Sequence, residues 1–367
     1  MTSALVAIDL PGGPAFVQTL QRIWDAGDAA FPVDRRLPRP ARERLLTAMA
    51  PARIVDESGS HEQGDSRPVE LGDALVVATS GSSGEPKGVV LTHDAVAASA
   101  RASNDRLAVG HSDRWLACLP LSHVGGLSVV TRAVLSGTPL TVHAGFDAEA
   151  AMASGATLVS LVATALRRVD PAAFRTILLG GGPAPPDRPP NAVTTYGMTE
   201  TGSGLVYGGL PLGSVEGRID PAGEIHLRAP MLLRCYRDGT VPLVEGWFAT
   251  GDLGRWLDDG RLHVEGRRAD LIIPGGENVW PAPVEDVLRR VPGVGDVAVT
   301  GTPDPEWGQL VTAYVVPAGT DPPTLDVVRA AVKQELPARC SPRRLVLVDT
   351  LPRTNLGKVA RHRLRNP

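Results

Sequence analysis

A run of small and polar residues over positions 79–88 has the composition of a phosphate-binding loop. It reads Thr-Ser-Gly-Ser-Ser-Gly-Glu-Pro-Lys-Gly. Small side chains let the backbone approach a polyanion, so that N–H groups and hydroxyls can surround phosphate oxygens while Lys87 adds charge. The run differs from a Gly-Lys-Ser/Thr loop, because Pro86 precedes the lysine and Gly88 follows it. A flexible turn rich in serine and glycine is the alternative interpretation.

Two further motifs carry carboxylates suited to a nucleotide and its metal ion. Residues 196–201 read Tyr-Gly-Met-Thr-Glu-Thr, where an aromatic ring can stack on a base and Glu200 can bind Mg²⁺, which prefers hard oxygen ligands. Residues 246–252 read Gly-Trp-Phe-Ala-Thr-Gly-Asp, and a carboxylate on such a turn can accept hydrogen bonds from ribose hydroxyls. Each motif alone is also compatible with an ordinary turn, which holds a core tyrosine in the first case and a turn aspartate in the second.

Lysine is rare in this chain, and two of its lysines lie within motifs. Of the 37 basic residues, only Lys87, Lys333 and Lys358 are lysines. Lys358 ends the segment Pro-Arg-Thr-Asn-Leu-Gly-Lys near the C-terminus, where a solvated tail charge is the simplest interpretation. A lysine offers a compact, movable charge where arginine offers a flat fork. The lysines that remain in this arginine-rich chain are therefore candidates for a functional role.

The surrounding sequence predicts the elements that position these residues. From residue 71 onward, short apolar runs of the buried-strand type alternate with helical patterns, which predicts a layered α/β domain. The expected strands cover residues 74–78, 89–91, 115–119, 140–143, 157–161, 176–179 and 192–196. The expected helices cover 95–100, capped by Thr92, 127–135 and 164–169. Residues 1–70 give weaker signals: a helix over 16–24, a loop over 35–44 that leads into a short helix, and a polar surface loop over 57–68.

The sequence pattern changes twice towards the C-terminus. Between residues 202 and 264, short predicted strands such as 224–228 and 261–265 lie among glycine and proline turns, which indicates a β-rich subdomain. Beyond residue 268, the pattern predicts a small α+β unit. Its expected helices cover 284–291 and 325–336, and its expected strands cover 296–301, 311–316 and 344–348. We therefore predict two domains, residues 1–268 and residues 269–367.

Composition disfavours several classes of function. The 367 residues are 43% hydrophobic and 21% charged and carry a net charge of −3, which is typical of a globular protein and does not favour binding to nucleic acid or a membrane surface. No apolar run reaches the roughly 18 residues of a spanning helix. Residues 1–11 lack the core of a signal peptide, so we expect a cytoplasmic protein. The three cysteines are far apart, which argues against a disulfide framework and a zinc site.

Taken in order, these motifs resemble those of the adenylate-forming superfamily, which includes acyl- and aryl-CoA synthetases, luciferases and the adenylation domains of peptide synthetases. The resemblance covers roughly residues 71–367 and includes Gly-Arg-Arg-Ala-Asp at 266–270 and Gly-Gly-Glu-Asn-Val at 275–279. Within the superfamily, the short chain and the segment Leu-Pro-Leu-Ser-His-Val-Gly-Gly at 119–126 are most similar to the 2-succinylbenzoate–CoA ligases of menaquinone biosynthesis, of compact actinobacterial type.

This resemblance implies an ATP-dependent ligation in two half-reactions. The carboxylate of a small acid attacks the α-phosphorus of Mg·ATP to give an acyl-AMP and diphosphate, and the thiol of coenzyme A then displaces AMP. An anion must approach a polyanion, so we expect positioning and cationic stabilisation to dominate catalysis. The expected cofactor is Mg²⁺, with ATP and coenzyme A as co-substrates. The resemblance implies a large α/β domain with a β-rich subdomain and a small mobile α+β domain, and it leaves a homodimer open.

The matching motifs imply a role for each aligned residue. Lys358 is expected to bridge the substrate carboxylate and the α-phosphate, Thr199 to lie near that phosphate, and Glu200 to bind Mg²⁺; these three are the expected catalytic residues. The expected nucleotide-binding residues are Thr79, Ser80, Gly81, Ser82, Ser83, Gly84, Lys87, Gly180, Gly181, Gly182, Tyr196, Thr199, Asp252 and Arg267. The expected acyl pocket consists of Ser122, His123, Gly125, Gly126 and Thr201, and the expected coenzyme A site of Gly275, Gly276, Glu277 and Asn278.

Several points stay open at the level of sequence. The small domain of such enzymes rotates between the half-reactions about a pivot expected at Ala269–Asp270, but relatives usually have Asp or Lys where this chain has Ala269. A lone histidine such as His123 is more often a satisfied core residue than a pocket residue. The partner of the substrate's second carboxylate is open among Ser122, His123 and Thr201.

Three alternative functions also remain. The first is another aryl- or short-acyl-CoA synthetase, the second is adenylation of an acid for a carrier-protein thiol, and the third is a nucleotide-binding scaffold without catalysis.

Overall fold

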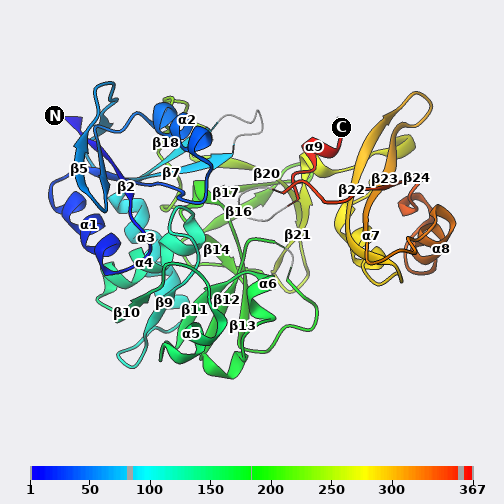
Figure 1. Cartoon of the computed structure of the whole chain (residues 1–367), viewed down its shortest axis with the longest axis horizontal. Coiled ribbons are helices and arrows are strands. Elements are labelled where there is room, and N and C mark those ends of the chain that lie inside the picture. Colours follow the sequence, from blue (N-terminus) through cyan, green and yellow to red (C-terminus); the bar gives the residue numbers. More distant parts are fainter. Residues whose placement is uncertain (1, 81–85, 183, 354–358, 366–367) are drawn as a thin grey trace. The chain divides into compact units, whose positions relative to one another are not determined.

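The computed structural model describes residues 2–80, 86–182, 184–353 and 359–365 (Figure 1). The chain divides into two compact units. The first comprises residues 1–218, 226–249 and 256–262, and the second comprises residues 219–225, 250–255 and 263–367. Both helices and sheets are present, and the expected α/β class is confirmed. The pivot expected at Ala269–Asp270 lies in the 3₁₀ turn η3 (Arg268–Asp270) and stays a prediction.

A seven-stranded sheet in the first unit is built mainly from the first 92 residues. Its strands, from one edge to the other, are β18 (Cys235–Tyr236), β8 (Pro86–Thr92), β7 (Asp73–Ser80), β3 (Ala29–Pro32), β2 (Leu5–Asp9), β4 (Arg53–Asp56) and β5 (Gly59–Glu62). Strands β2, β3, β4 and β7 are parallel, whereas β8 runs antiparallel to β7. The polar stretch 57–68, expected as a loop, thus contributes the exposed edge strand β5.

Helices cover both faces of this sheet. Phe16, on α1 (Pro14–Asp25), belongs to the same apolar cluster as Val6 and Ile8 of β2, whereas Met49, on α2 (Arg39–Met49), clusters with the intervening Leu5 and Ala7. Strand β2 is therefore apolar on both faces, as buried parallel strands are. This explains why its sequence shows no alternation.

The second sheet of the first unit has the order β10-β9-β11-β12-β13-β14-β15. Its strands are β9 (Trp115–Ala117), β10 (Leu140–Val142), β11 (Leu158–Leu161), β12 (Thr176–Leu179), β13 (Ala192–Gly197), β14 (Gly204–Tyr207) and β15 (Leu210–Pro211). The first five in that order are parallel, so their carboxyl ends share one edge. Helices α3 (His93–Arg106) and α4 (Val124–Ser136) pack against each other, and the side chain of Thr92 accepts a hydrogen bond from the amide of Ala95, as predicted for a cap.

Shorter elements complete the first unit and its surroundings. The remaining helices and turns there are α5 (Ala148–Ala153), α6 (Ala163–Leu166), η1 (Pro171–Ala173) and η2 (Thr199–Thr201). Strands β1 (Thr2–Ser3) and β6 (Val69–Glu70) form a two-stranded pair. A further sheet has the order β16-β17-β20-β19, with β21 beside β20. Its strands are β16 (Glu216–Ile219), β17 (Glu224–Arg228), β19 (Leu243–Val244), β20 (Trp247–Trp256) and β21 (Leu262–Arg267).

The second unit is built around a three-stranded sheet with its own apolar core. Strand β22 (Val294–Asp304) runs antiparallel to β23 (Gly308–Pro317), and β24 (Arg344–Leu347) runs parallel to β23. Val284 and Leu288 of α7 (Pro281–Leu288) and Val328 of α8 (Leu325–Glu335) cluster with the apolar residues of these strands. The remaining elements are η4 (Pro274–Gly276), η5 (Ala338–Cys340) and α9 (His362–Arg365). The predicted strands and helices of the small α+β unit are confirmed.

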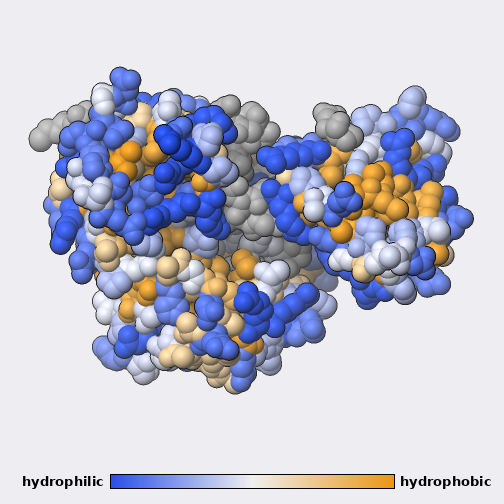
Figure 2. Space-filling model, in the orientation of Figure 1, coloured by the Kyte–Doolittle hydropathy of each residue, from blue (hydrophilic) through white to orange (hydrophobic). Residues whose placement is uncertain are grey.

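The surface in view in Figure 2 is mainly hydrophilic and is interrupted by apolar patches on each unit. Large exposed apolar residues among those described include Leu71, Val241 and Val244. Within the part of the chain that the structure describes, no helix has the length and hydrophobicity needed to cross a membrane.

Candidate nucleotide and acyl site

Expected site residues follow the carboxyl ends of parallel strands in the second sheet. The segment with Ser122 and His123 follows β9, and the three glycines 180–182 follow β12. Tyr196 lies at the end of β13, and η2 with Thr199 and Glu200 comes next. Ligands of open α/β sheets bind outside this edge. The fold therefore gathers these expected site residues where a ligand can reach them.

The expected phosphate-binding loop joins β7 and β8. Thr79 is paired with Lys87, and Ser80 with Pro86, at the last positions of this antiparallel ladder. The four expected loop residues Gly81, Ser82, Ser83 and Gly84 lie outside the described residues. The ladder thus holds the two ends of the loop together, with the charged Lys87 at one of them.

Tyr236 connects this lysine to the expected metal ligand. The ammonium Nζ of Lys87 lies 5.1 Å from the centre of the Tyr236 ring, and the Tyr236 hydroxyl donates a hydrogen bond of 3.1 Å to Oε1 of Glu200. Glu200 is half-buried and forms no ion pair with any described residue, so its oxygens suit a divalent cation. Tyr236 was not predicted as a site residue. The available signal was an aromatic residue directly before the polar turn Arg-Asp-Gly at 237–239.

The second unit brings together two further predicted residues. Asp252 is 4% exposed, and its Oδ1 lies 2.8 Å from Nε of Arg267. Arg267 also donates a hydrogen bond to the carbonyl of Thr250, whose hydroxyl accepts from the amide of Asp252. The arginine thus orients a buried carboxylate of the kind that a pair of ribose hydroxyls requires.

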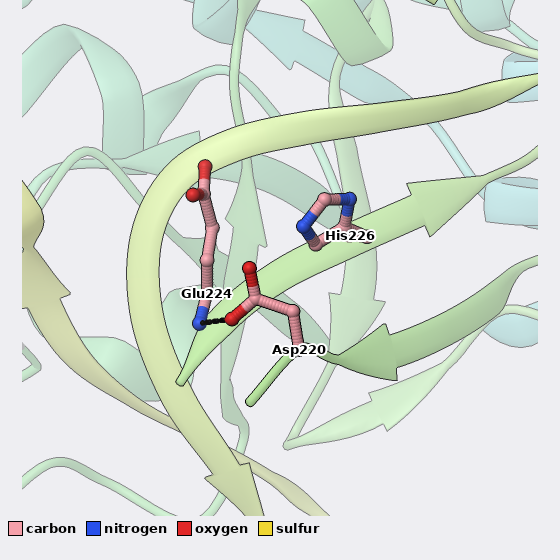
Figure 3. Close-up of side chains that lie close together, drawn as sticks. All are labelled: Asp220, Glu224 and His226. Atoms are coloured by element: carbon pink, nitrogen blue, oxygen red, sulfur yellow. Dashed lines mark hydrogen bonds between the residues drawn. The ribbon is translucent and has the colours of Figure 1, made fainter. Parts of the chain in front are cut away.

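A different group of possible metal ligands consists of Asp220, Glu224 and His226 (Figure 3). Asp220 Oδ1 accepts a hydrogen bond of 2.8 Å from the amide of Glu224 and so closes the turn before β17. One carboxylate oxygen of Glu224 accepts from the amide of Gly251, and the other pairs with Arg268, each at 2.8 Å. These acids hold backbone and arginine in place, and we interpret the group as structural.

A small cavity in the first unit has room for about one water molecule. It lies among α3, α4, β7, β8 and Gly202. The lining residues are Leu75, Leu91, Val96, Ser99, Val124, Leu127, Ser128, Thr131 and Gly202. None of the predicted pocket residues lines it, but His123 is the N-cap residue of α4, whose inner face does. The cavity is too small for an aromatic ring, so we do not assign the acyl group to it.

The predicted pocket residues have different surroundings. A Cβ atom on Gly126 would lie 2.4 Å from the carbonyl oxygen of Leu119, so the close approach of backbone requires glycine there. A Cβ on the exposed Gly125 would contact only Leu119 Cδ1, at 3.7 Å. Thr201 is fully buried, and its hydroxyl donates to the carbonyl of Ser203 and accepts from the amide of Met198. Thr201 is thus engaged in its own turn.

His123 contacts two residues that were not predicted. Its Nε2 lies 2.8 Å from Arg36 NH2 and 3.3 Å from Asp34 Oδ2. Asp34 is 6% exposed and accepts two hydrogen bonds of 2.8 Å from Arg36. Burial alone would raise the pKa of Asp34, but the bonds from Arg36 and His123 outweigh it and hold the pKa well below the usual range. The only local signal was Asp-Arg-Arg directly after a short strand.

The remaining predictions concern the second unit. Gly275 and Gly276 lie in η4, and Gly275 has a φ of 60° and packs so close to Trp307 that a Cβ would lie 2.9 Å from its ring. Glu277 and Asn278 follow directly. Lys358 lies outside the described residues. The residues on either side of segment 354–358 are joined by an antiparallel bridge between Arg353 and Val359.

Comparison with known proteins identifies the class. The family model of AMP-binding enzymes matches residues 54–237, and the model of the AMP-binding enzyme C-terminal domain matches residues 283–358. The chain therefore belongs to the AMP-binding enzyme family, as the resemblance of its motifs predicted.

Individual members of this family show a more specific similarity. A probable 2-succinylbenzoate–CoA ligase of Mycobacterium tuberculosis is 41% identical over 359 residues, which cover 88% of this chain and 92% of that protein. A 2-succinylbenzoate–CoA ligase of Bacillus velezensis is 37% identical over 88% of this chain and 75% of its own length. The structure of o-succinylbenzoate CoA synthetase (MenE) from Bacillus subtilis in complex with the acyl-adenylate intermediate OSB-AMP superposes with a TM-score of 0.88. It has 29% sequence identity and covers 99% of this chain and 88% of that one.

Proposed function

We propose that this protein is an AMP-forming acid–CoA ligase that activates 2-succinylbenzoate as its acyl-AMP and transfers the acyl group to coenzyme A, a step of menaquinone biosynthesis. The observation that carries the proposal is the similarity, along almost the whole chain, to relatives named for this reaction. The position of Tyr196, Thr199 and Glu200 at one carboxyl edge supports it. We expect the enzyme to act in the cytoplasm, where ATP and coenzyme A are available.

The phosphates of ATP require positive charge and backbone donors. We assign Thr79, Lys87 and the loop between them to the β- and γ-phosphates, and Thr199 to the neighbourhood of the α-phosphate. Glu200 is the carboxylate we assign to Mg²⁺, because it is half-buried and lacks an ion-pair partner among the described residues. The ion, when bound, neutralises phosphate charge. The hydrogen bond from the Tyr236 hydroxyl to Oε1 of Glu200 orients this carboxylate.

The nucleoside is assigned to other predicted residues. We assign the adenine to the glycines 180–182 and the ring of Tyr196, and the ribose hydroxyls to Asp252. Arg267 holds that aspartate by an ion pair of 2.8 Å, which orients the carboxylate.

The lysine and the coenzyme A site belong to different half-reactions. Lys358 is assigned to the first, where its ammonium reduces the repulsion between the acid and the α-phosphate. The segment from Gly275 to Asn278 is assigned to the pantetheine arm of coenzyme A in the second. A rotation of residues 269–367 about Ala269–Asp270 would exchange the two.

A panel of acids tests the proposed function. Diphosphate release is measured with 2-succinylbenzoate, benzoate and cinnamate, each with ATP, Mg²⁺ and coenzyme A, and the thioester is identified by mass spectrometry. We expect 2-succinylbenzoate to give the highest kcat/KM, and Glu200→Gln to raise the Mg²⁺ concentration needed for half-maximal rate. A preference for benzoate or cinnamate, or a product without coenzyme A, would contradict the proposal.

A further inference from the structure

Arg36 and His123 meet where the carboxyl ends of two sheets come together. Arg36 follows β3, which runs parallel to β7, the strand that leads into the expected phosphate-binding loop. His123 follows β9 of the other parallel sheet and is the N-cap residue of α4, where its side chain makes no capping hydrogen bond. The contact of 2.8 Å between the two side chains therefore lies at the edge where such sheets bind ligands.

The guanidinium of Arg36 is held firmly on one side only. Its Nε and NH2 donate to the two oxygens of the buried Asp34, each at 2.8 Å, in a two-pronged pair. NH1 has no hydrogen-bond partner among the described residues, and 44% of the side chain is exposed. Arg36 is thus oriented by one carboxylate and retains donors for another.

His123 lies directly beside this pair. Its Nε2 is 2.8 Å from Arg36 NH2 and 3.3 Å from Asp34 Oδ2, so the ring contacts both members and helps to hold the guanidinium in place. The remaining NH1 of Arg36 is then a positioned, charged donor at the ligand edge, which a carboxylate needs when it leaves water.

We propose that Arg36, oriented by Asp34, binds the carboxylate of the acid that is not activated, and thereby selects aromatic dicarboxylic acids over monocarboxylic ones. The inference rests on the proposed function and adds the residue that determines its substrate class. For the question left open among Ser122, His123 and Thr201, the inference gives His123 the role of positioning Arg36 and takes the cation from a segment outside that set.

The test compares two acids that differ by one carboxylate. These are 2-succinylbenzoate and 4-oxo-4-phenylbutanoate, which keeps the activated chain and lacks the carboxylate on the ring. We expect Arg36→Gln to raise KM for 2-succinylbenzoate by about 10- to 100-fold, the effect of losing one charge-assisted hydrogen bond. Values for 4-oxo-4-phenylbutanoate and the KM for ATP should stay unchanged.

The neighbouring arginine provides a matched control. Arg35 pairs with the exposed Glu57 and with the mostly buried Asp9. Arg35→Gln removes the same charge from the position next to Arg36 and should leave both acids unaffected. Because Arg36→Gln leaves the buried Asp34 without its partner, Arg36→Lys is measured as well. Lysine keeps the charge but cannot form the two-pronged pair, so we expect a smaller rise in KM for the dicarboxylate alone.

Each outcome decides the inference. Equal losses for both acids, or unchanged kinetics in Arg36→Gln, would overturn it. If the wild-type enzyme rejects 2-succinylbenzoate but prefers another dicarboxylic acid, the proposed function fails, and the inference is decided by that acid and its monocarboxylic analogue. A wild-type enzyme that prefers monocarboxylic acids overturns both.

Discussion

The first unit contains a buried aspartate, Asp34, that holds Arg36, and the second contains a buried glutamate, Glu285, that holds Arg361. The two carboxylates are almost equally buried, at 6% and 3% exposure. The arginines differ. Arg36 keeps one nitrogen without a partner among the described residues and is 44% exposed, whereas Arg361 is 21% exposed.

All three guanidinium nitrogens of Arg361 have partners. Nε donates to the carbonyl of Val299, NH2 lies 2.7 Å from Glu285 Oε1, and NH1 lies 3.6 Å from Asp270. Glu285 also accepts from the amide of Val299 at 2.8 Å and from Arg289. We call Glu285–Arg361 the closed pair; it joins α7, β22 and the C-terminal segment. We call Asp34–Arg36 the open pair, because its arginine retains a donor at the edge where we propose that the acid binds. A buried ion pair therefore indicates a binding site only when its arginine has donors left.

The largest expected effect concerns Lys358, which lies close to Arg361 of the closed pair in the sequence. Arg361 follows Lys358 by three residues, and the bridge between Arg353 and Val359 joins the ends of segment 354–358. We expect Lys358→Ala to slow adenylation by about 100- to 1,000-fold, as loss of a transition-state donor does, while thioester formation from supplied acyl-AMP persists. The exposed Lys333 on α8 provides the control, and Lys333→Ala should leave both half-reactions intact. Equal slowing of both half-reactions by Lys358→Ala would contradict the assignment.

Replacing the acid of each ion pair by its amide compares how much the two pairs stabilise the fold. Glu285→Gln leaves Arg361 half-buried beside a neutral amide, and we expect it to lower the free energy of unfolding by about 3 kcal/mol, the scale for breaking a buried pair. Asp34→Asn should lower it by about 1 kcal/mol, because the more exposed Arg36 remains hydrated. Urea denaturation of both variants measures the difference. Equal losses would show that the open pair is as structural as the closed one.

Two neighbouring glycines repeat the contrast within the first unit. Gly126 faces backbone, so Gly126→Ala should destabilise the fold by about 1–3 kcal/mol through overpacking. Gly125 faces space, so Gly125→Ala should leave the melting temperature unchanged and raise KM for the acid if the acyl group lies there. Thermal melts and acid titrations of the two variants separate these effects. A destabilised Gly125→Ala would show that this position, too, is closed.

Local patterns were enough to predict much of the fold. The apolar run 176–179 coincides with β12, and Thr92 caps α3. Both features could be predicted because strand burial and helix capping depend on residues that are neighbours in the sequence. The first 62 residues were harder. Strand β2 is buried on both faces and shows no alternation, and a short apolar run of this kind cannot be assigned by periodicity. Four strands of this seven-stranded sheet, β2, β3, β4 and β5, were therefore identified only in the structure.

The candidate site, too, could be predicted only in part from the sequence. Glu200 and Asp252 lie in contiguous motifs and could be proposed from them. Arg36 and His123 are 87 positions apart and meet only because two sheets converge. The contact between Tyr236 and Glu200 likewise depends on the pairing of β18 with β8. Long-range contacts of this kind leave no local pattern in the sequence.

The smallest expected effect is a pH dependence that belongs to the open pair. Hydrogen bonds from Arg36 and His123 outweigh the burial that would raise the pKa of Asp34, so this pKa is lower in the folded than in the unfolded state. A group of this kind stabilises the fold above its unfolded pKa, and the stabilisation is lost as the pH falls below about 4. Asp34→Asn should therefore be less stable than wild type at neutral pH, with a difference that shrinks in acid. Urea denaturation across this range measures it, and a difference that stays constant with pH would show that Asp34 contributes packing instead of charge.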